Sequence, residues 1–138
     1  MNLSKEKGYN DFLIDIKNRI REAQYSALKT VNKELINLYW DIGKKIVEKQ
    51  EKFSWGKAVV ETLAKDLQKE YLGIKGFSVQ NLWYMRQFYN HYKDNSKLQP
   101  LVGEISWVKN VIIMSKCNDD SEREFKTNKV IYYGLKSD

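Results

Sequence analysis

The chain has 138 residues, 42% of them hydrophobic and 13% aromatic, which suits one domain or two small subdomains and argues against wholesale disorder. The formal net charge is +6, and the first hundred residues hold the whole basic excess, which favours a polyanion such as nucleic acid, or an anionic membrane surface, as a partner. The single cysteine excludes a disulfide framework within one chain, and the single histidine has no second ligand at zinc-binding spacing.

The N-terminal segment MNLSKEKGYN lacks the apolar core of a secretory signal, and no apolar run is long enough to cross a bilayer. We therefore expect a cytoplasmic protein without a membrane span. One proline and seven glycines leave little turn chemistry for the hairpins of a sandwich or barrel. The composition accordingly predicts an all-α fold, in a single domain over residues 1–138.

The first predicted element is a long helix over about residues 9–52, because its apolar residues recur at steps of three and four. Gly43 lies inside this helix, where a bend or break is one expectation. A stripe of this length packs along its own domain or against the same helix of a second subunit, so a homo-oligomer is one expected assembly. The stripe consists of Leu13, Ile16, Ile20, Ala23, Ala27, Val31, Leu35, Leu38, Ile42 and Ile46.

Residues 57–92 are predicted to form a helix-turn-helix. Its first helix, near 57–71, has a predicted buried side at Val60, Leu63, Ala64, Leu67 and Tyr71. Gly73 is placed to end that helix in a left-handed conformation, and 73–77 form the turn. Ser78 caps the second helix, near 79–92, because its hydroxyl can accept from the free amides of the first turn.

Residues 101–134 are predicted to contain two shorter helices. Ser106 is the expected cap of a helix that continues to Lys116. Ser121-Glu122-Arg123-Glu124 has capping-box spacing, so it should open a last helix that stops at Gly134.

The outer face of the second helix of the hairpin has an unusual composition. With Leu82, Met85, Tyr89 and Tyr92 on the inner side, the opposite side carries Gln80, Trp83, Tyr84, Gln87 and His91, and no acid occurs from Phe77 to Lys93. Amides and arginine suit hydrogen bonding to base edges in the major groove. The alternatives are that Trp83 and Tyr84 belong to the core or to a subunit interface, or that the face binds RNA or another ligand.

The DNA-binding hypothesis assigns a role to each residue near this helix. Base contacts are expected from the first part of the recognition helix, and lysines nearby position the phosphates. The candidate residues are Gln80, Asn81, Tyr84 and Gln87 for the bases, Lys69, Lys75 and Arg86 for the phosphates, and Ser78 at the helix start.

The sequence gives no comparable case for catalysis, a metal or a cofactor. Glu124-Phe125-Lys126 fits the E-x-K part of a nuclease motif, but Asp15-Ile16-Lys17 fits the D-x-K form inside a predicted helix, so the pattern arises by chance here. Cys117 and His91 lack a third group for nucleophilic catalysis, and no phosphate-binding glycine loop is present. The prediction is a protein that is not itself an enzyme.

Three stretches resemble a known family: LYWDIGKKIVEKQ at 38–50, WGKAVVETLAKDLQKEYLGIKGFSVQNLWYMRQFY at 55–89, and LQPLVGEISWVKNVIIMSKCNDDSEREF at 98–125. They are similar to the N-terminal domain of the bacterial YhcG family, also called Domain of Unknown Function 1016, over roughly residues 10–125. The positions that match its motif are Trp55, Gly56, Lys57, Gly76, Phe77, Ser78, Asn81, Leu82, Met85 and Arg86.

The resemblance implies a helical module that binds DNA or a partner protein. Members of the family typically join it to a C-terminal PD-(D/E)XK nuclease domain and occur near restriction–modification and mobile defence genes. Here the sequence after REF departs from the family pattern, and no nuclease half follows. These departures predict a shortened member, a gene fragment, or one half of a split protein that acts with a separate nuclease subunit.

Overall fold

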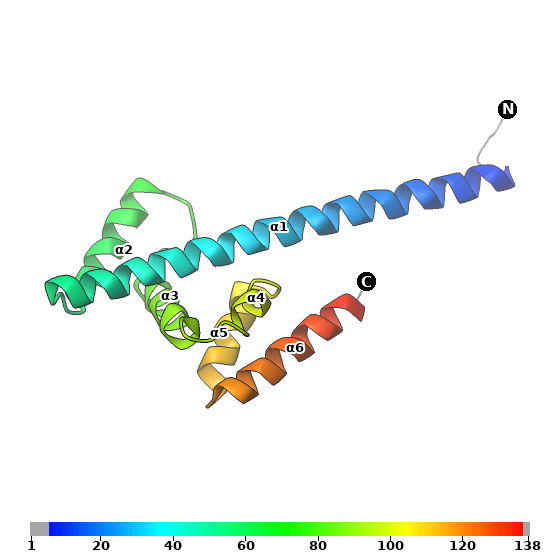
Figure 1. The fold of residues 1–138 in the computed structure, drawn as a ribbon. Helices are drawn as coiled ribbons and strands as arrows, with labels where there is room; N and C mark the ends of the chain where they lie inside the picture. The colour runs from blue at the N-terminus through cyan, green and yellow to red at the C-terminus, as the bar shows by residue number, and fades with distance from the viewer. Residues whose placement is uncertain (1–5, 137–138) are drawn as a thin grey trace. The chain divides into compact units, whose positions relative to one another are not determined.

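The computed structural model describes residues 6–136 as helices joined by short connections (Figure 1). The helices are α1 (Lys7–Phe53), α2 (Ala58–Glu70), α3 (Val79–Tyr92), α4 (Gln99–Val102), α5 (Trp107–Lys116) and α6 (Asp120–Lys136). No strand occurs within these residues, so the predicted all-α class with a long first helix is confirmed. The contacts divide the chain into one compact unit that ends at Val31 and another that begins at Asn32.

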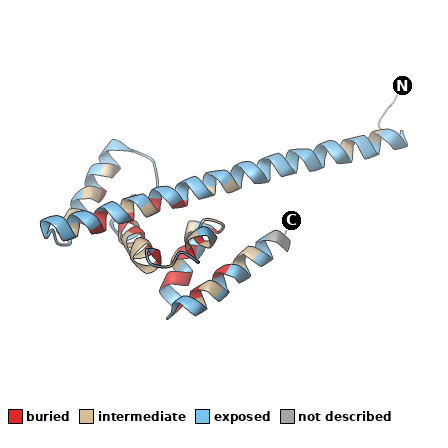
Figure 2. Ribbon diagram, in the orientation of Figure 1, coloured by how far each residue is buried: buried red, intermediate tan, exposed pale blue. Residues whose placement is uncertain are grey.

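The described part of the first unit is essentially one segment of α1, from Lys7 to Val31. Figure 2 shows this segment as exposed over almost its whole length. None of its residues is buried, and the exposed fractions of Ile16, Ile20 and Val31 are 45%, 50% and 65%. Within this segment the members of the predicted stripe are exposed, except Leu13, which is half-buried.

Within the second unit, the buried face of α1 is not the predicted stripe. Leu35 and Leu38 of the stripe are 37% and 46% exposed, and of its members only Ile46 is buried. Leu35 and Leu38 are therefore not buried within their own domain, and the alternative expectation, packing against a second subunit, stays a prediction. The helix has a second apolar face, and that face carries the core residues Ile36, Tyr39, Gly43, Ile46 and Val47.

Gly43 explains which of the two faces is covered. The predicted break does not occur, because α1 continues through Gly43 as one helix. A Cβ atom at this position would overlap the carbonyl group of Met85 in α3 and would lie 3.1 Å from the amide nitrogen of Arg86. The absence of a side chain therefore lets the backbones of α1 and α3 approach closely.

The second unit has a core of large aromatic and aliphatic side chains. Trp107 of α5 makes edge-on ring contacts with Tyr39 of α1 and Phe88 of α3, at centroid separations of 4.9 Å and 5.2 Å. Trp40 packs edge-on against Phe88 at 5.7 Å. Edge-to-face aromatic pairs add to the free energy gained by burial. Trp107 thus joins the packing of α1, α3 and α5.

The hairpin helices agree with the sequence in part: Leu63 and Leu67, expected on the buried side of α2, are only half-buried. Val60 and Ala64 of α2 are buried as predicted, but Tyr71 lies after the helix and is 46% exposed. On α3, Phe88 is fully buried where Tyr89 was expected, and Tyr89 is half-buried. The angle of 100° per residue is an average, and the sequence does not show which elements cover the helix. A helical wheel can therefore assign burial to the residue next to the one that is actually buried.

The C-terminal part contains α4, which the sequence did not predict, followed by α5 and α6. Ser106 caps α5 as expected: its hydroxyl accepts from the amide of Lys109 at 3.2 Å. Ser121 does not begin α6. Asp119 does, because its Oδ1 accepts from the amide of Glu122 at 2.8 Å while the Glu122 carboxylate accepts from the amide of Asn118 at 3.2 Å.

The last predicted helix also ends later than expected. α6 continues through Gly134 to Lys136, and the predicted stop at Gly134 is wrong. Cys117 lies in the core between α5 and α6. Among residues 6–136, no helix combines the length and the hydropathy needed to cross a bilayer.

Candidate nucleic-acid interface

The candidate interface is the hairpin of α2 and α3. Their apolar faces share one cluster, in which Val60 and Ala64 pack with Leu82 and Met85. The connection between the helices, residues 71–78, contains Gly73 at φ 82° and Gly76 at φ 114°. It is longer than the three or four residues that join a helix-turn-helix of the standard DNA-binding kind.

Gly76 holds the end of this connection against α1. Its φ of 114° is unfavourable for a side chain, and a Cβ atom here would overlap the hydroxyl group of Tyr39. The Gly76 carbonyl accepts from Nδ2 of Asn81 at 2.7 Å. The connection is therefore fixed to both α1 and α3, which sets where α3 begins.

Asn81 uses its side chain within the fold. Nδ2 donates to the Gly76 carbonyl, and Oδ1 accepts from Nε1 of Trp107 at 2.7 Å. The Tyr39 hydroxyl is a further neighbour: burial raises the pKa of Tyr39 and its hydrogen bond with Asn81 lowers it, with burial the larger effect. Asn81 thus links the turn, α3 and α5, and its amide is not offered to an outside ligand.

A line of polar side chains remains on the outer face of α3. Gln80 is exposed, while Tyr84, Gln87 and His91 are half-buried. Nε2 of Gln80 donates to the Tyr84 hydroxyl at 3.0 Å, and Nε2 of Gln87 lies 3.4 Å from Nε2 of His91. These contacts join residues four apart on one helix, so they order the side chains along one face.

His91 at the end of this line has an environment that favours its neutral form. Burial lowers its pKa, and the nearby Arg123 guanidinium lowers it further, against a smaller opposing effect of Asp120. The imidazole is therefore neutral at pH 7 and can donate or accept a hydrogen bond.

Arg86 and Trp83 form the border of this face. Nε of Arg86 donates to Oε1 of Gln50 in α1 at 2.6 Å, and its guanidinium lies 5.6 Å from the ring centroid of Trp83. Trp83 also packs against the core. Arg86 is consequently held between α1 and α3. Its guanidinium therefore has a structural role in the fold, although the same group also suits a phosphate.

Exposed lysines flank the start of α3 on two sides. One shallow hollow of about 350 Å³ has Lys75, Ser78, Gln80 and Tyr84 on its walls. A second, of about 340 Å³, brings Val79 of α3 next to Lys65 and Lys69 of α2. The Ser78 hydroxyl accepts from the Asn81 amide at 3.1 Å, as predicted for the cap. The predicted set Lys69, Lys75, Ser78 and Gln80 is therefore gathered at one end of α3.

A different surface is strongly apolar. A groove of about 680 Å³ runs between α1 and α2, with Leu38, Ile42, Leu63, Leu67 and Phe77 among its lining residues. Lys45 and Lys49 also line it. The sequence did not predict this groove, because Leu38 and Leu67 were expected to be core residues. The feature that could have indicated it is that α1 has more apolar positions than one buried face can hold.

The acidic side chains around the E-x-K sequence at Glu124 form ion pairs within the fold. Glu124 pairs with Lys97, Oε1 to Nζ at 3.0 Å, and Asp120 pairs with Arg123, Oδ1 to NH1 at 3.0 Å. Within residues 6–136, no group of three or more His, Cys, Asp or Glu side chains could hold a metal ion. Burial raises the pKa of the Cys117 thiol, which disfavours the reactive thiolate.

Comparison with known proteins supports the resemblance. The sequence profile of the DUF1016 N-terminal domain matches residues 15–137. The chain belongs to the DUF1016 N-terminal domain family. A relative in Escherichia coli (strain K12), named "Putative nuclease YhcG", is 29% identical over 103 residues, which cover 72% of this chain and 27% of the relative. No solved structure matches the chain. This family member therefore spans about a quarter of the length of that relative.

Proposed function

We propose that this family member binds duplex DNA, without catalysis of its own, through the N-terminal end of α3. The observation that carries the proposal is the grouping of Lys65, Lys69 and Lys75 in the two hollows that flank Ser78 and Val79. Among residues 6–136, none of these lysines forms a salt bridge. Cations around the amino end of a helix suit the phosphates of a nucleic acid backbone.

The outer face of α3 supports the same proposal. Gln80, Tyr84 and Gln87 hold one another or His91 by hydrogen bonds that an outside partner can replace. Amide side chains of this kind can pair with base edges in the major groove. Asn81 and Arg86 are set apart from this role, because their side chains bond to Trp107 and Gln50 within the fold. The relative's name, which describes a nuclease, is consistent with a DNA-binding module.

The proposal divides the candidate residues into two sets with different expected effects. Lys69 and Lys75 neutralise phosphates, so removing both should weaken binding to all sequences and reduce the dependence of the affinity on salt. Gln80 and Gln87 contact bases, so removing them should cost about 1–3 kcal/mol per contact on a preferred sequence and little on others.

The test is fluorescence anisotropy of a labelled 25-base-pair duplex of random sequence, titrated with the full chain at several salt concentrations. We expect Lys69→Ala/Lys75→Ala to bind more weakly than the wild type and with a smaller salt slope. The matched control is Lys116→Ala/Lys126→Ala, which removes the same charge from exposed positions on α5 and α6. Equal loss in both variants would mean that only net charge matters, and would overturn the assignment to α3.

A further inference from the structure

The segment of α1 in the first unit carries many exposed apolar side chains. Between Lys7 and Val31, large side chains are exposed at Phe12, Ile14, Ile16, Ile20, Tyr25, Leu28 and Val31. All buried residues of α1 lie at Ile36 or beyond. A single helix with this much apolar surface is marginal in water unless it packs on another element, and contiguous apolar patches mark interaction sites.

One face of this segment has the regular spacing of a helix–helix contact. Leu13, Ile16, Ile20, Ala23 and Ala27 follow one another at steps of three and four residues. This spacing places them along one narrow seam, as in a coiled-coil pair. The seam is large at its N-terminal end and small at its C-terminal end, because leucine and isoleucine give way to alanine.

We propose that this seam pairs with the same seam of a second copy of the chain, in antiparallel order. Placing Ile16 opposite the partner's Ile20 also places Leu13 opposite the partner's Ala23, and Tyr9 opposite the partner's Ala27. Tyr9 and Leu13 then each meet an alanine across the contact, and the isoleucines meet one another at its centre, which fills space without overlap. A parallel pair would bring the large residues together at one end and the alanines together at the other.

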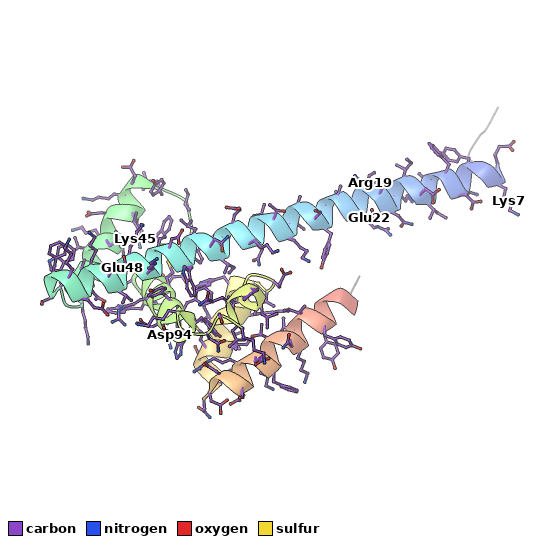
Figure 3. The ribbon with its side chains drawn as sticks, viewed as in Figure 1. Lys7, Arg19, Glu22, Lys45, Glu48 and Asp94 are labelled. Carbon is purple, nitrogen blue, oxygen red and sulfur yellow. The ribbon has the colours of Figure 1, made fainter. Side chains whose placement is uncertain are left out.

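The charge along the segment favours the same order. Residues 6–16 carry three acids, Glu6, Asp11 and Asp15, against Lys7 alone. Residues 17–29 carry four basic residues against one acid, Glu22. Antiparallel pairing sets the acidic part of each helix beside the basic part of its partner, and parallel pairing sets like charges together. Figure 3 labels Lys7, Arg19 and Glu22 along this stretch of α1.

The second copy is thus favoured by two independent features of this helix, the change from large to small side chains along its seam and its charge order. The contact uses only residues of the first unit, and it does not depend on DNA binding. An assembly of this kind would give each complex two α3 helices.

The oligomeric state of the full chain tests the contact. In sedimentation velocity over a concentration series, we expect a dimer for the wild type and an increase of about 100-fold or more in its dissociation constant for Ile16→Lys/Ile20→Lys. The control is Ile14→Lys/Asn18→Lys, which has the same spacing and the same added charge on the opposite side of the helix. The control should remain dimeric, and equal dissociation of both variants would overturn the seam.

Cysteine cross-linking tests the order of the two helices. Leu13→Cys and Ala23→Cys are prepared separately, mixed and oxidised. We expect the mixed disulfide to dominate, because antiparallel pairing brings these two positions together. Disulfides of Leu13→Cys with itself would show a parallel pair, and a monomeric wild type would rule out the second copy altogether. Cys117 can remain in place, since it is buried and its raised pKa disfavours exchange.

Discussion

Gly43→Ala should destabilise the second unit, although alanine is the better helix former. Within a helix, replacing glycine by alanine gains about 1 kcal/mol. At Gly43, however, the new methyl group would overlap the carbonyl group of Met85, which is backbone and cannot rotate away. Overpacking of a tight contact costs about 1–3 kcal/mol, and a clash with backbone belongs at the upper end of that range.

The net effect should be a loss of about 2 kcal/mol in the free energy of unfolding, because α1 and α3 must move apart. For a chain of this size the melting temperature should fall by roughly 8 °C. The assay is urea and thermal unfolding followed by circular dichroism at 222 nm. Gly134→Ala is the control: it also lies in a helix, but with nothing within 4 Å of the added Cβ atom, so it should be neutral or slightly stabilising. A Gly43→Ala protein at least as stable as the wild type would refute the close approach.

Three further predictions concern single side chains. Asn81→Ala should lower the free energy of unfolding in urea by about 2–3 kcal/mol, because it leaves Trp107 Nε1 and the Gly76 carbonyl without their partner. The control is the exposed neighbour: Gln80→Ala should change the free energy of unfolding by less than about 0.5 kcal/mol. Equal effects would contradict the structural role of Asn81. Asp119→Ala should cost about 1 kcal/mol and Ser121→Ala almost nothing, since Asp119 caps α6, and the reverse order would restore Ser121 as the cap. Burial raises the pKa of Tyr92 to about 12, above its value in the unfolded chain, so its contribution to stability is complete below about pH 10 and is lost as the pH rises towards 12. In melting temperatures measured from pH 9 to 12, the Tyr92→Phe variant should show a smaller decline than the wild type. An unchanged decline would show that Tyr92 is not its source.

Local features were the most predictable from the sequence. Ser78 and Ser106 cap their helices as expected, because a cap depends on residues three positions away. The box that opens α6 was misplaced by two residues, since Asp119 and Ser121 both have an acid three positions later, and the sequence does not show which is used.

The buried face of α1 could not be predicted in the same way. The helix has two apolar faces: periodicity indicated the stripe at steps of three and four, and the fold covers the other face. Gly43 determines which face is covered. The sequence predicted a possible bend or break there, but Gly43 is where the backbone of α3 comes close to α1. In sequence terms, the partner of this glycine is Met85, 42 positions away, so only the tertiary structure reveals the contact.

The candidate interface shows the same limit. Gln80, Lys69, Lys75 and Ser78 come together at the start of α3, as local spacing implied. Asn81 was assigned to base reading because its residue type suits adenine, but its oxygen accepts from Trp107, 26 positions later. An amide is equally suited to bases and to tying a turn, and the choice depends on what lies opposite it.

The central claim, DNA binding at the start of α3, is tested most directly by mapping backbone amide shifts in a ¹⁵N-labelled protein titrated with a short duplex at low salt. The account predicts that the shifts concentrate at Lys69, at 75–80, and along Tyr84 and Gln87, and that they diminish as salt is raised. Binding that leaves these amides unmoved and shifts others, or no binding to duplex DNA by a folded sample, would contradict it.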